Sequence, residues 1–140
     1  QERLNYTAIG DGVNLAARLE SLCKPYGVDL IVSESVRNAA PAMLYLPLDL
    51  VRVKGKQQPV LIYTVLPQEM AAVDNIQQAI HRFGEFLQCW QAGDWIAAAT
   101  SLDAYESAAS GIEPLYRQRL QHFRAAPPQD WDGVYTFHDK

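Results

Sequence analysis

The chain has 140 residues and a net charge of −4 at pH 7. This length is enough for one ordinary domain or for one small domain with an appendage. Residues 1–66 hold seven Lys or Arg against six Asp or Glu, whereas residues 67–140 hold five against ten. This balance argues against a nucleic-acid-binding face, which needs a basic patch. No run approaches the roughly 20 apolar residues that span a bilayer, and the first residue, Gln1, indicates a piece of a longer or processed protein.

The first predicted elements are a β-like run, a turn and an amphipathic helix in the segment NYTAIGDGVNLAARLE, residues 5–20. Asp11 lies in the turn and is expected to cap the helix. Four residues then recur at the spacing of one apolar helix face: Leu15, Leu19, Leu22 and Tyr26. Gly27 is expected to end this helix.

Asn14 and Arg18 lie four residues apart and therefore on one side of that helix. They are close to the helix N-terminus, where unpaired N–H groups and the helix dipole favour an anion such as phosphate. From spacing alone, a solvated helix face is the more common arrangement for such a pair. The spacing does not decide between these two interpretations.

Three strands and a short helix are predicted next. Residues 28–32 form an apolar run typical of a buried strand, and Ser33 is expected to cap a short helix that ends before Pro41. The mostly alternating run 46–53 and the run 60–66 predict two more strands, joined by a hairpin loop with Gly55 at the turn. This order predicts an α/β layer in which helices cover a sheet.

The second half of the chain predicts three helices, over residues 69–91, 94–109 and 113–125. The first two resemble one unit of a tetratricopeptide repeat, with Asp94 as a cap and Ala98 and Ala99 where the helices approach. A stable solenoid needs about three such units, so a packing appendage or dimer contact is the expected role. The predicted organisation is an α/β unit over residues 1–67, a helical extension over 68–126 and an extended tail over 127–140. Trp131 is expected to hold the tail against the rest of the chain.

Three separated segments resemble the C-terminal half of the class III adenylate and guanylate cyclase catalytic domain: Tyr6–Asp11, Val13–Glu20 and Val53–Lys56. The resemblance runs over residues 3–66 and implies a partial α+β sandwich of the ferredoxin-like kind. The helical part and the closing Trp131-Asp132-Gly133 are similar to the tail of bacterial cyclases that carry a CHASE2 sensor. A parent of that kind would place this chain in the cytoplasm, with any inner-membrane anchor upstream.

The resemblance implies roles for four residues. Thr7 corresponds to the position that reads the purine edge, where many bacterial adenylate cyclases have Thr. Asn14 corresponds to the amide that orients the ribose, and Arg18 to the guanidinium that meets the triphosphate as charge builds. Lys54 corresponds to the lysine that reaches the phosphates. Gly12 departs from the family, which usually has Thr or Ala there, and loosens the start of the helix.

The implied function is conversion of ATP to 3′,5′-cyclic AMP and pyrophosphate by a homodimer in signal transduction. In the family, two Mg²⁺ or Mn²⁺ ions are held by aspartates from the first half of the domain, which also supplies a purine-reading Lys. Asp11, Asp29 and Asp49 do not stand in that motif; the first is interpreted as a helix cap and the others as surface acids. We therefore expect no metal ligands here and no catalysis by this chain alone.

Two alternatives stay open. One is a non-catalytic, cyclase-like dimerisation or nucleotide-sensing module. This alternative would be favoured if the first half of the domain lacked the metal-binding aspartates. The other is a guanylate cyclase, which Thr7 disfavours because guanylate cyclases usually have Cys at that position.

Overall fold

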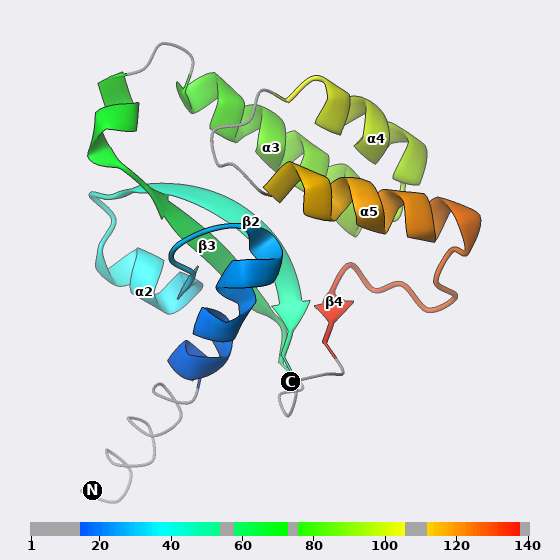
Figure 1. The fold of residues 1–140 in the computed structure, drawn as a ribbon, viewed down its shortest axis with the longest axis horizontal. Coiled ribbons are helices and arrows are strands. Elements are labelled where there is room, and N and C mark those ends of the chain that lie inside the picture. Colours follow the sequence, from blue (N-terminus) through cyan, green and yellow to red (C-terminus); the bar gives the residue numbers. More distant parts are fainter. Residues whose placement is uncertain (1–14, 54–57, 73–75, 106–111, 138–140) are drawn as a thin grey trace, which may run out of the picture.

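The computed structural model describes residues 15–53, 58–72, 76–105 and 112–137 (Figure 1). Residues 15–26 are helical. The elements that follow are β1 (Val32–Ser33), α2 (Glu34–Ala39), β2 (Leu44–Arg52), β3 (Val60–Leu66), the 3₁₀ helix η1 (Gln68–Ala72), α3 (Ile76–Gln91), α4 (Trp95–Asp103), α5 (Ile112–Ala125) and β4 (Tyr135–Thr136). The predicted α+β fold with a helical C-terminal part is confirmed.

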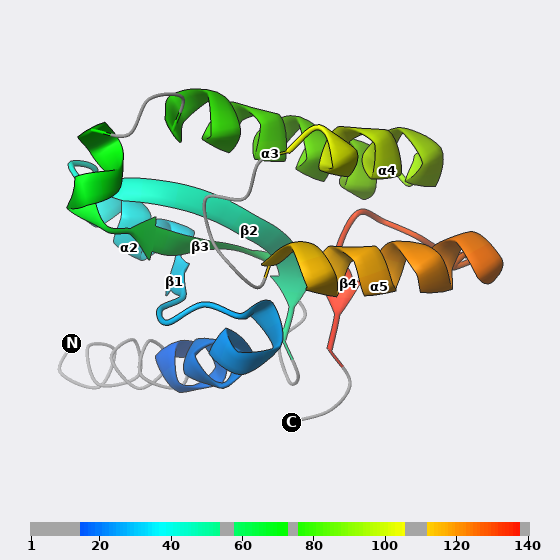
Figure 2. The same ribbon diagram turned by 45° about the horizontal axis from the view of Figure 1, so that its top comes forward.

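The four strands form one sheet in the order β1-β3-β2-β4. β3 pairs antiparallel with both β1 and β2, whereas β4 pairs in parallel with β2, with Val51 opposite Tyr135. In Figure 2 the sheet runs between α3 and α4 on one side and the helix over residues 15–26 on the other. The C-terminal segment, predicted as an extended tail, therefore adds a strand to the sheet.

β2 contains a shift of register between Pro47 and Asp49, so that Leu48 is an extra residue in the strand. Buried residues alternate on each side of this shift but change phase across it, with Leu46 and Leu48 before it and Asp49, Val51 and Val53 after it. A β-bulge has this effect, and Pro is tolerated inside a sheet chiefly at such irregularities. Asp49 is consequently buried, and its predicted position on the surface is wrong; Asp29 is exposed as expected.

Local signals placed several element ends correctly. Gly27 follows the first helix with a φ of 67°. Ser33 caps α2 by accepting a hydrogen bond from Val36 N at 3.5 Å, and Asp94 caps α4 by accepting one from Ala97 N at 3.1 Å. These caps satisfy N–H groups that have no partner within the helix. The Asp11 cap and the Gly55 turn lie outside the described residues.

Several predicted bounds are wrong. The strand predicted over residues 46–53 is β2, Leu44–Arg52. Residues 28–31 do not pair in the sheet, and β1 is limited to Val32–Ser33. The helix predicted over 69–91 is two elements, because Met70 N donates to Pro67 O at 2.9 Å and starts the 3₁₀ helix η1 before α3 begins. α4 ends at Asp103, since Ala104 serves as its C-cap.

One hydrophobic core joins the sheet to the helical extension. It includes Leu19 and Leu22 from the first helix, Leu46 from β2, Phe86 from α3 and Leu120 from α5. α3 packs against α4, and Ala98 of α4, one of the small residues expected at that contact, is fully buried. Within the described ranges, no helix has the length and hydropathy needed to cross a membrane.

Candidate functional site

Of the four residues with implied roles, the structure describes Arg18; Thr7, Asn14 and Lys54 lie outside the described residues. Arg18 is on the exposed side of the helix over residues 15–26, directly before the buried Leu19. The opposite face of this helix is anchored in the core. Its guanidinium therefore stands at the surface on a helix whose own position is fixed, and its role in phosphate binding stays a prediction.

The chain that leads to Lys54 is held in place by the C-terminal tail. Arg52, two residues before Lys54, forms an ion pair with Asp132 at 3.1 Å and donates to Thr136 Oγ1 at 2.9 Å. The carbonyl of Arg52 accepts a hydrogen bond from Phe137 N at 2.9 Å. The backbone N–H of Val134 and the Arg52 guanidinium lower the pKa of Asp132. The end of β2 is thus tied to the tail by backbone and side-chain bonds.

Trp131 holds that tail against the helical extension, as expected. Its indole N–H lies 3.2 Å from the carbonyl oxygen of Trp90 and 3.0 Å from that of Gln91, at the end of α3. Its ring also contacts the rings of Trp90, Trp95 and Phe123, with centroids 5.4–5.5 Å apart. The tail therefore connects the end of α3 with the end of β2.

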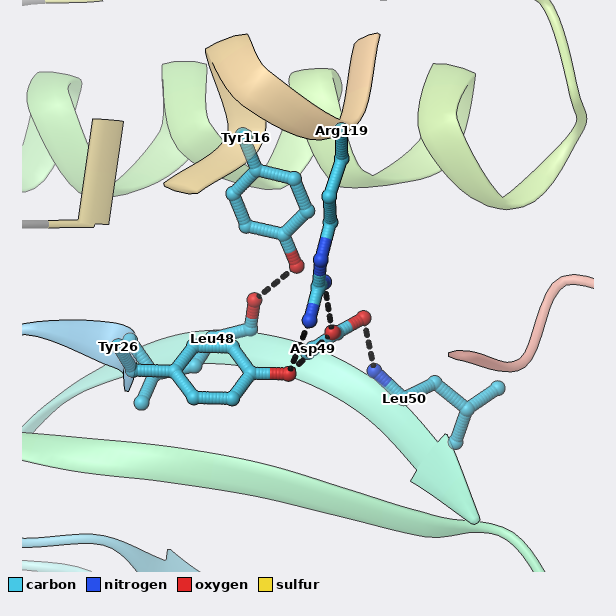
Figure 3. A network of polar contacts seen from close by, with 6 residues as sticks. All are labelled: Tyr26, Leu48, Asp49, Leu50, Tyr116 and Arg119. Atoms are coloured by element: carbon cyan, nitrogen blue, oxygen red, sulfur yellow. Dashed lines mark hydrogen bonds and ion pairs between the residues drawn. The ribbon is translucent and has the colours of Figure 1, made fainter. Parts of the chain in front are cut away.

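A buried network joins the first helix, β2 and α5 around the Asp49 carboxylate (Figure 3). Its Oδ2 accepts hydrogen bonds from Tyr26 Oη at 2.6 Å and from Arg119 Nη1 at 2.7 Å. Its Oδ1 accepts one from Leu50 N at 2.9 Å. Arg119 Nη2 also donates to Tyr26 Oη at 3.1 Å, which closes the triangle. The side chains of Asp49 and Arg119 are 0% and 6% exposed, so this is an ion pair of the interior.

The charges of this network balance each other. Burial, reinforced by the charge of Asp49, raises the pKa of Tyr26 well above its usual value, so its hydroxyl stays protonated and donates. Burial alone would lower the pKa of Arg119, but the Asp49 carboxylate raises it above its usual value. The guanidinium also lies 3.5 Å from the ring centroid of Tyr135 on β4, a cation–π contact that is strongest away from water.

α5 also contacts the bulge itself. Tyr116, one turn before Arg119, donates its hydroxyl to the carbonyl oxygen of Leu48 at 2.6 Å. Burial raises the pKa of Tyr116 well above its usual value, which keeps this donor protonated. Figure 3 shows both side chains reaching from α5 to the same part of β2.

Sequence reasoning missed Arg119 and assigned Asp49 to the surface. The signal for Arg119 is its place on the apolar face of α5, whose buried residues also include Ile112, Tyr116 and Leu120. A charged residue on such a face must find a buried partner. The signal for Asp49 is the change of phase in the apolar alternation of β2, which marks a bulge.

Three curated relatives are similar to part of this chain. It is 45% identical over 67 residues to an adenylate cyclase of Anabaena cylindrica, and 40% identical over 67 residues to adenylate cyclase 1 of Rhizobium meliloti (strain 1021). It is 37% identical over 73 residues to the terminal-differentiation specific adenylate cyclase of Dictyostelium discoideum. The chain contains an adenylate cyclase-related region.

These matches cover 45%, 47% and 49% of this chain but 13%, 10% and 3% of the respective adenylate cyclases. The chain therefore spans a small part of the length of its relatives. No family model and no solved structure matches the chain.

The described residues of this adenylate cyclase-related chain do not form the metal site that the resemblance implies for a complete domain. Among them, no three or more His, Cys, Asp or Glu side chains are grouped so that they could hold a metal ion. Asp49, the buried acid nearest in the sequence to Lys54, uses both carboxylate oxygens to accept hydrogen bonds from the protein. Both carboxylate oxygens of Asp49 are therefore occupied by contacts within the protein.

Proposed function

We propose that this chain is part of an adenylate cyclase that converts ATP to 3′,5′-cyclic AMP and pyrophosphate in signal transduction. The observation that carries the proposal is the identity of 37–45% with three adenylate cyclases over 67–73 residues. In this proposal the chain belongs to the C-terminal half of a class III catalytic domain. It supplies the purine-, ribose- and phosphate-binding side of the site.

The complete enzyme is proposed to be a homodimer in which each site combines residues of both chains. The two Mg²⁺ or Mn²⁺ ions are proposed to bind to aspartates of the first half of the domain, as the resemblance to the cyclase family implies. We propose the cytoplasmic side of the inner membrane for this chain, and the resemblance of the helical part to bacterial cyclases with a CHASE2 sensor supports that proposal.

The reaction requires positioning and positive charge from this side of the site. The 3′-oxygen of ATP attacks the α-phosphorus, the bond to pyrophosphate breaks, and negative charge shifts onto phosphate oxygens. Arg18 offers a planar fork of donors to those oxygens, whereas Lys54 offers a point charge. Asn14 orients the ribose. Fixed donors of this kind act mainly on the transition state, where the charge has developed.

The exposed position of Arg18 supports this assignment. Its helix is held by Leu19, Leu22 and Tyr26, which are all buried. A side chain on the open face of a fixed helix can meet a ligand without a change in the core. The backbone at Arg18 is thereby fixed, which contributes to the preorganised geometry that electrostatic catalysis requires.

Purine selectivity tests the adenylate assignment. We expect the complete protein to prefer ATP over GTP in kcat/KM, and Thr7→Cys, combined with a change of the upstream purine-reading Lys to Glu, to shift that preference toward GTP. An unpaired polar group costs about 1–3 kcal/mol, so each lost contact should change the ratio by about 5- to 160-fold. Thr100→Cys is the control, because Thr100 is exposed on α4.

Each other outcome of this experiment favours a stated alternative. A wild-type preference for GTP would identify a guanylate cyclase. ATP binding without any cyclic nucleotide would identify a nucleotide-sensing module. A purine ratio that Thr7 substitutions leave untouched would show that Thr7 does not read the base.

A further inference from the structure

We propose that Arg119 of the helical extension is a positioning residue for the cyclase reaction, which holds the Arg18-bearing helix and the bulge of β2 in one fixed arrangement. The inference rests on the proposed function. The helical extension does more than pack against the sheet, because its Arg119 side chain forms a buried ion pair with Asp49 of β2.

Arg119 acts on the Arg18 helix through its last residue. Arg119 Nη2 and Asp49 Oδ2 both bond to Tyr26 Oη, at 3.1 Å and 2.6 Å. Residues 15–26 form one helix, and eight residues of helix separate Arg18 from Tyr26 by about 12 Å along its axis. A small rotation or shift at Tyr26 is therefore passed along a rigid element to the guanidinium of Arg18.

Arg119 acts on β2 through Asp49. The carboxylate bonds to Arg119 and, through Oδ1, to the backbone N–H of Leu50. Tyr116 from the same helix fixes the preceding carbonyl, that of Leu48, at 2.6 Å. α5 thereby determines the geometry of the bulge from which the strand continues toward Lys54. One helix of the extension thus sets the relative position of the Arg18 helix and of the part of β2 that precedes Lys54.

Hydrogen bonds to a forked guanidinium specify direction as well as distance. A buried ion pair contributes little net stability compared with well-packed apolar side chains, so its presence is weak evidence for stabilisation. Catalysis is far more sensitive, because a misplacement of about 1 Å can lower a rate by about 100-fold. The network is therefore better explained by alignment of the site than by stability of the fold.

The test separates alignment from stability with three variants of the complete protein: Arg119→Met, Asp49→Asn/Arg119→Met and Arg119→Lys. The double variant removes both charges, so its melting temperature should lie closer to the wild-type value than that of Arg119→Met. We expect its kcat to stay at least tenfold below wild type, with the KM for ATP changed by less than about threefold. Arg119→Lys keeps the charge and should recover part of kcat. Arg124→Met, an exposed Arg on the same helix, is the control and should change neither value.

Hydrogen exchange of the 140-residue chain supplies a second readout that does not need activity. The amides of residues 19–24 and of Tyr26 should exchange faster in the double variant than in wild type, whereas their exchange rates in Arg124→Met should equal those of wild type. A double variant with wild-type kcat, or with unchanged protection of these amides, overturns the inference. A wild-type protein that makes no cyclic nucleotide refutes the proposed function instead, and the exchange rates then decide by themselves whether Arg119 holds this helix.

Discussion

Arg18→Ala should lower the kcat of the complete protein by about 100-fold or more while changing the KM for ATP by less than about threefold. The reason is that negative charge grows on the phosphate oxygens as pyrophosphate leaves, so a guanidinium placed there stabilises the transition state more than bound ATP. The measurement is steady-state kinetics with ATP over a range that brackets the KM. Arg18→Lys should give an intermediate kcat, because Lys keeps the charge without the planar fork.

Lys24→Ala is the matched control for this experiment. Lys24 is an exposed cation on the same helix, six residues after Arg18, and it has no role in the proposed site. Because Arg18 is also exposed, both substitutions should change the free energy of unfolding by no more than about 0.5 kcal/mol. An effect of Arg18→Ala confined to KM, or an equal loss of kcat in Lys24→Ala, would contradict the role assigned to Arg18.

Arg119→Met should lower the free energy of unfolding of the 140-residue chain by about 3–5 kcal/mol. The substitution leaves the fully buried Asp49 without its charged partner and Tyr26 Oη without one donor. Chemical denaturation with urea measures the change. Arg117→Met is the matched control on the same helix: Arg117 pairs with Asp103 and Glu113, but its side chain is 45% exposed. A surface pair contributes about 0–1 kcal/mol, so this control should have a small effect.

The double variant Asp49→Asn/Arg119→Met distinguishes an ion pair from unrelated packing losses. The amide that replaces the Asp49 carboxylate keeps an acceptor oxygen for hydrogen bonds but carries no buried charge. Coupled residues give non-additive effects, so the double variant should be more stable than Arg119→Met alone. If the double variant instead lost as much stability as Asp49→Asn and Arg119→Met lose together, the buried ion pair would not be the source of the loss.

The elements that the sequence predicts well are those whose ends depend on local chemistry. Ser33 and Asp94 are N-caps because their side-chain oxygens bond to an N–H three residues later in the chain. β3 is a short apolar run and was predicted with the bounds that the structure has. Neither property requires knowledge of distant residues.

Interactions between distant residues were not predictable in the same way. Asp49 and Arg119 are 70 residues apart, and Val51 pairs with Tyr135 across most of the chain. The bulge at Leu48 reverses which side chains point inward, so a reading that assumes regular alternation places Asp49 on the wrong side. The available sequence signal was Arg119, a charged residue on the apolar face of α5, which indicates a buried partner of opposite charge.

The residues of the candidate site also differ in whether the sequence alone could identify them. Thr7, Asn14, Arg18 and Lys54 were assigned through resemblance of short segments to a family, which does not depend on the fold of this chain. Arg119 lies in the helical extension, outside those segments, and only its contacts with Tyr26 and Asp49 connect it to the Arg18 helix. Its role was therefore accessible only from the three-dimensional arrangement.

We propose that this chain supplies one side of an adenylate cyclase site and that the first half of the domain supplies the other side. The most direct measurement compares the complete protein with the 140-residue chain, each given ATP and Mn²⁺, and identifies the products by mass spectrometry. We predict 3′,5′-cyclic AMP and pyrophosphate in equal amounts from the complete protein and neither from the chain alone. No cyclic AMP from the complete protein, or equal turnover by the isolated chain, would contradict this division of the site.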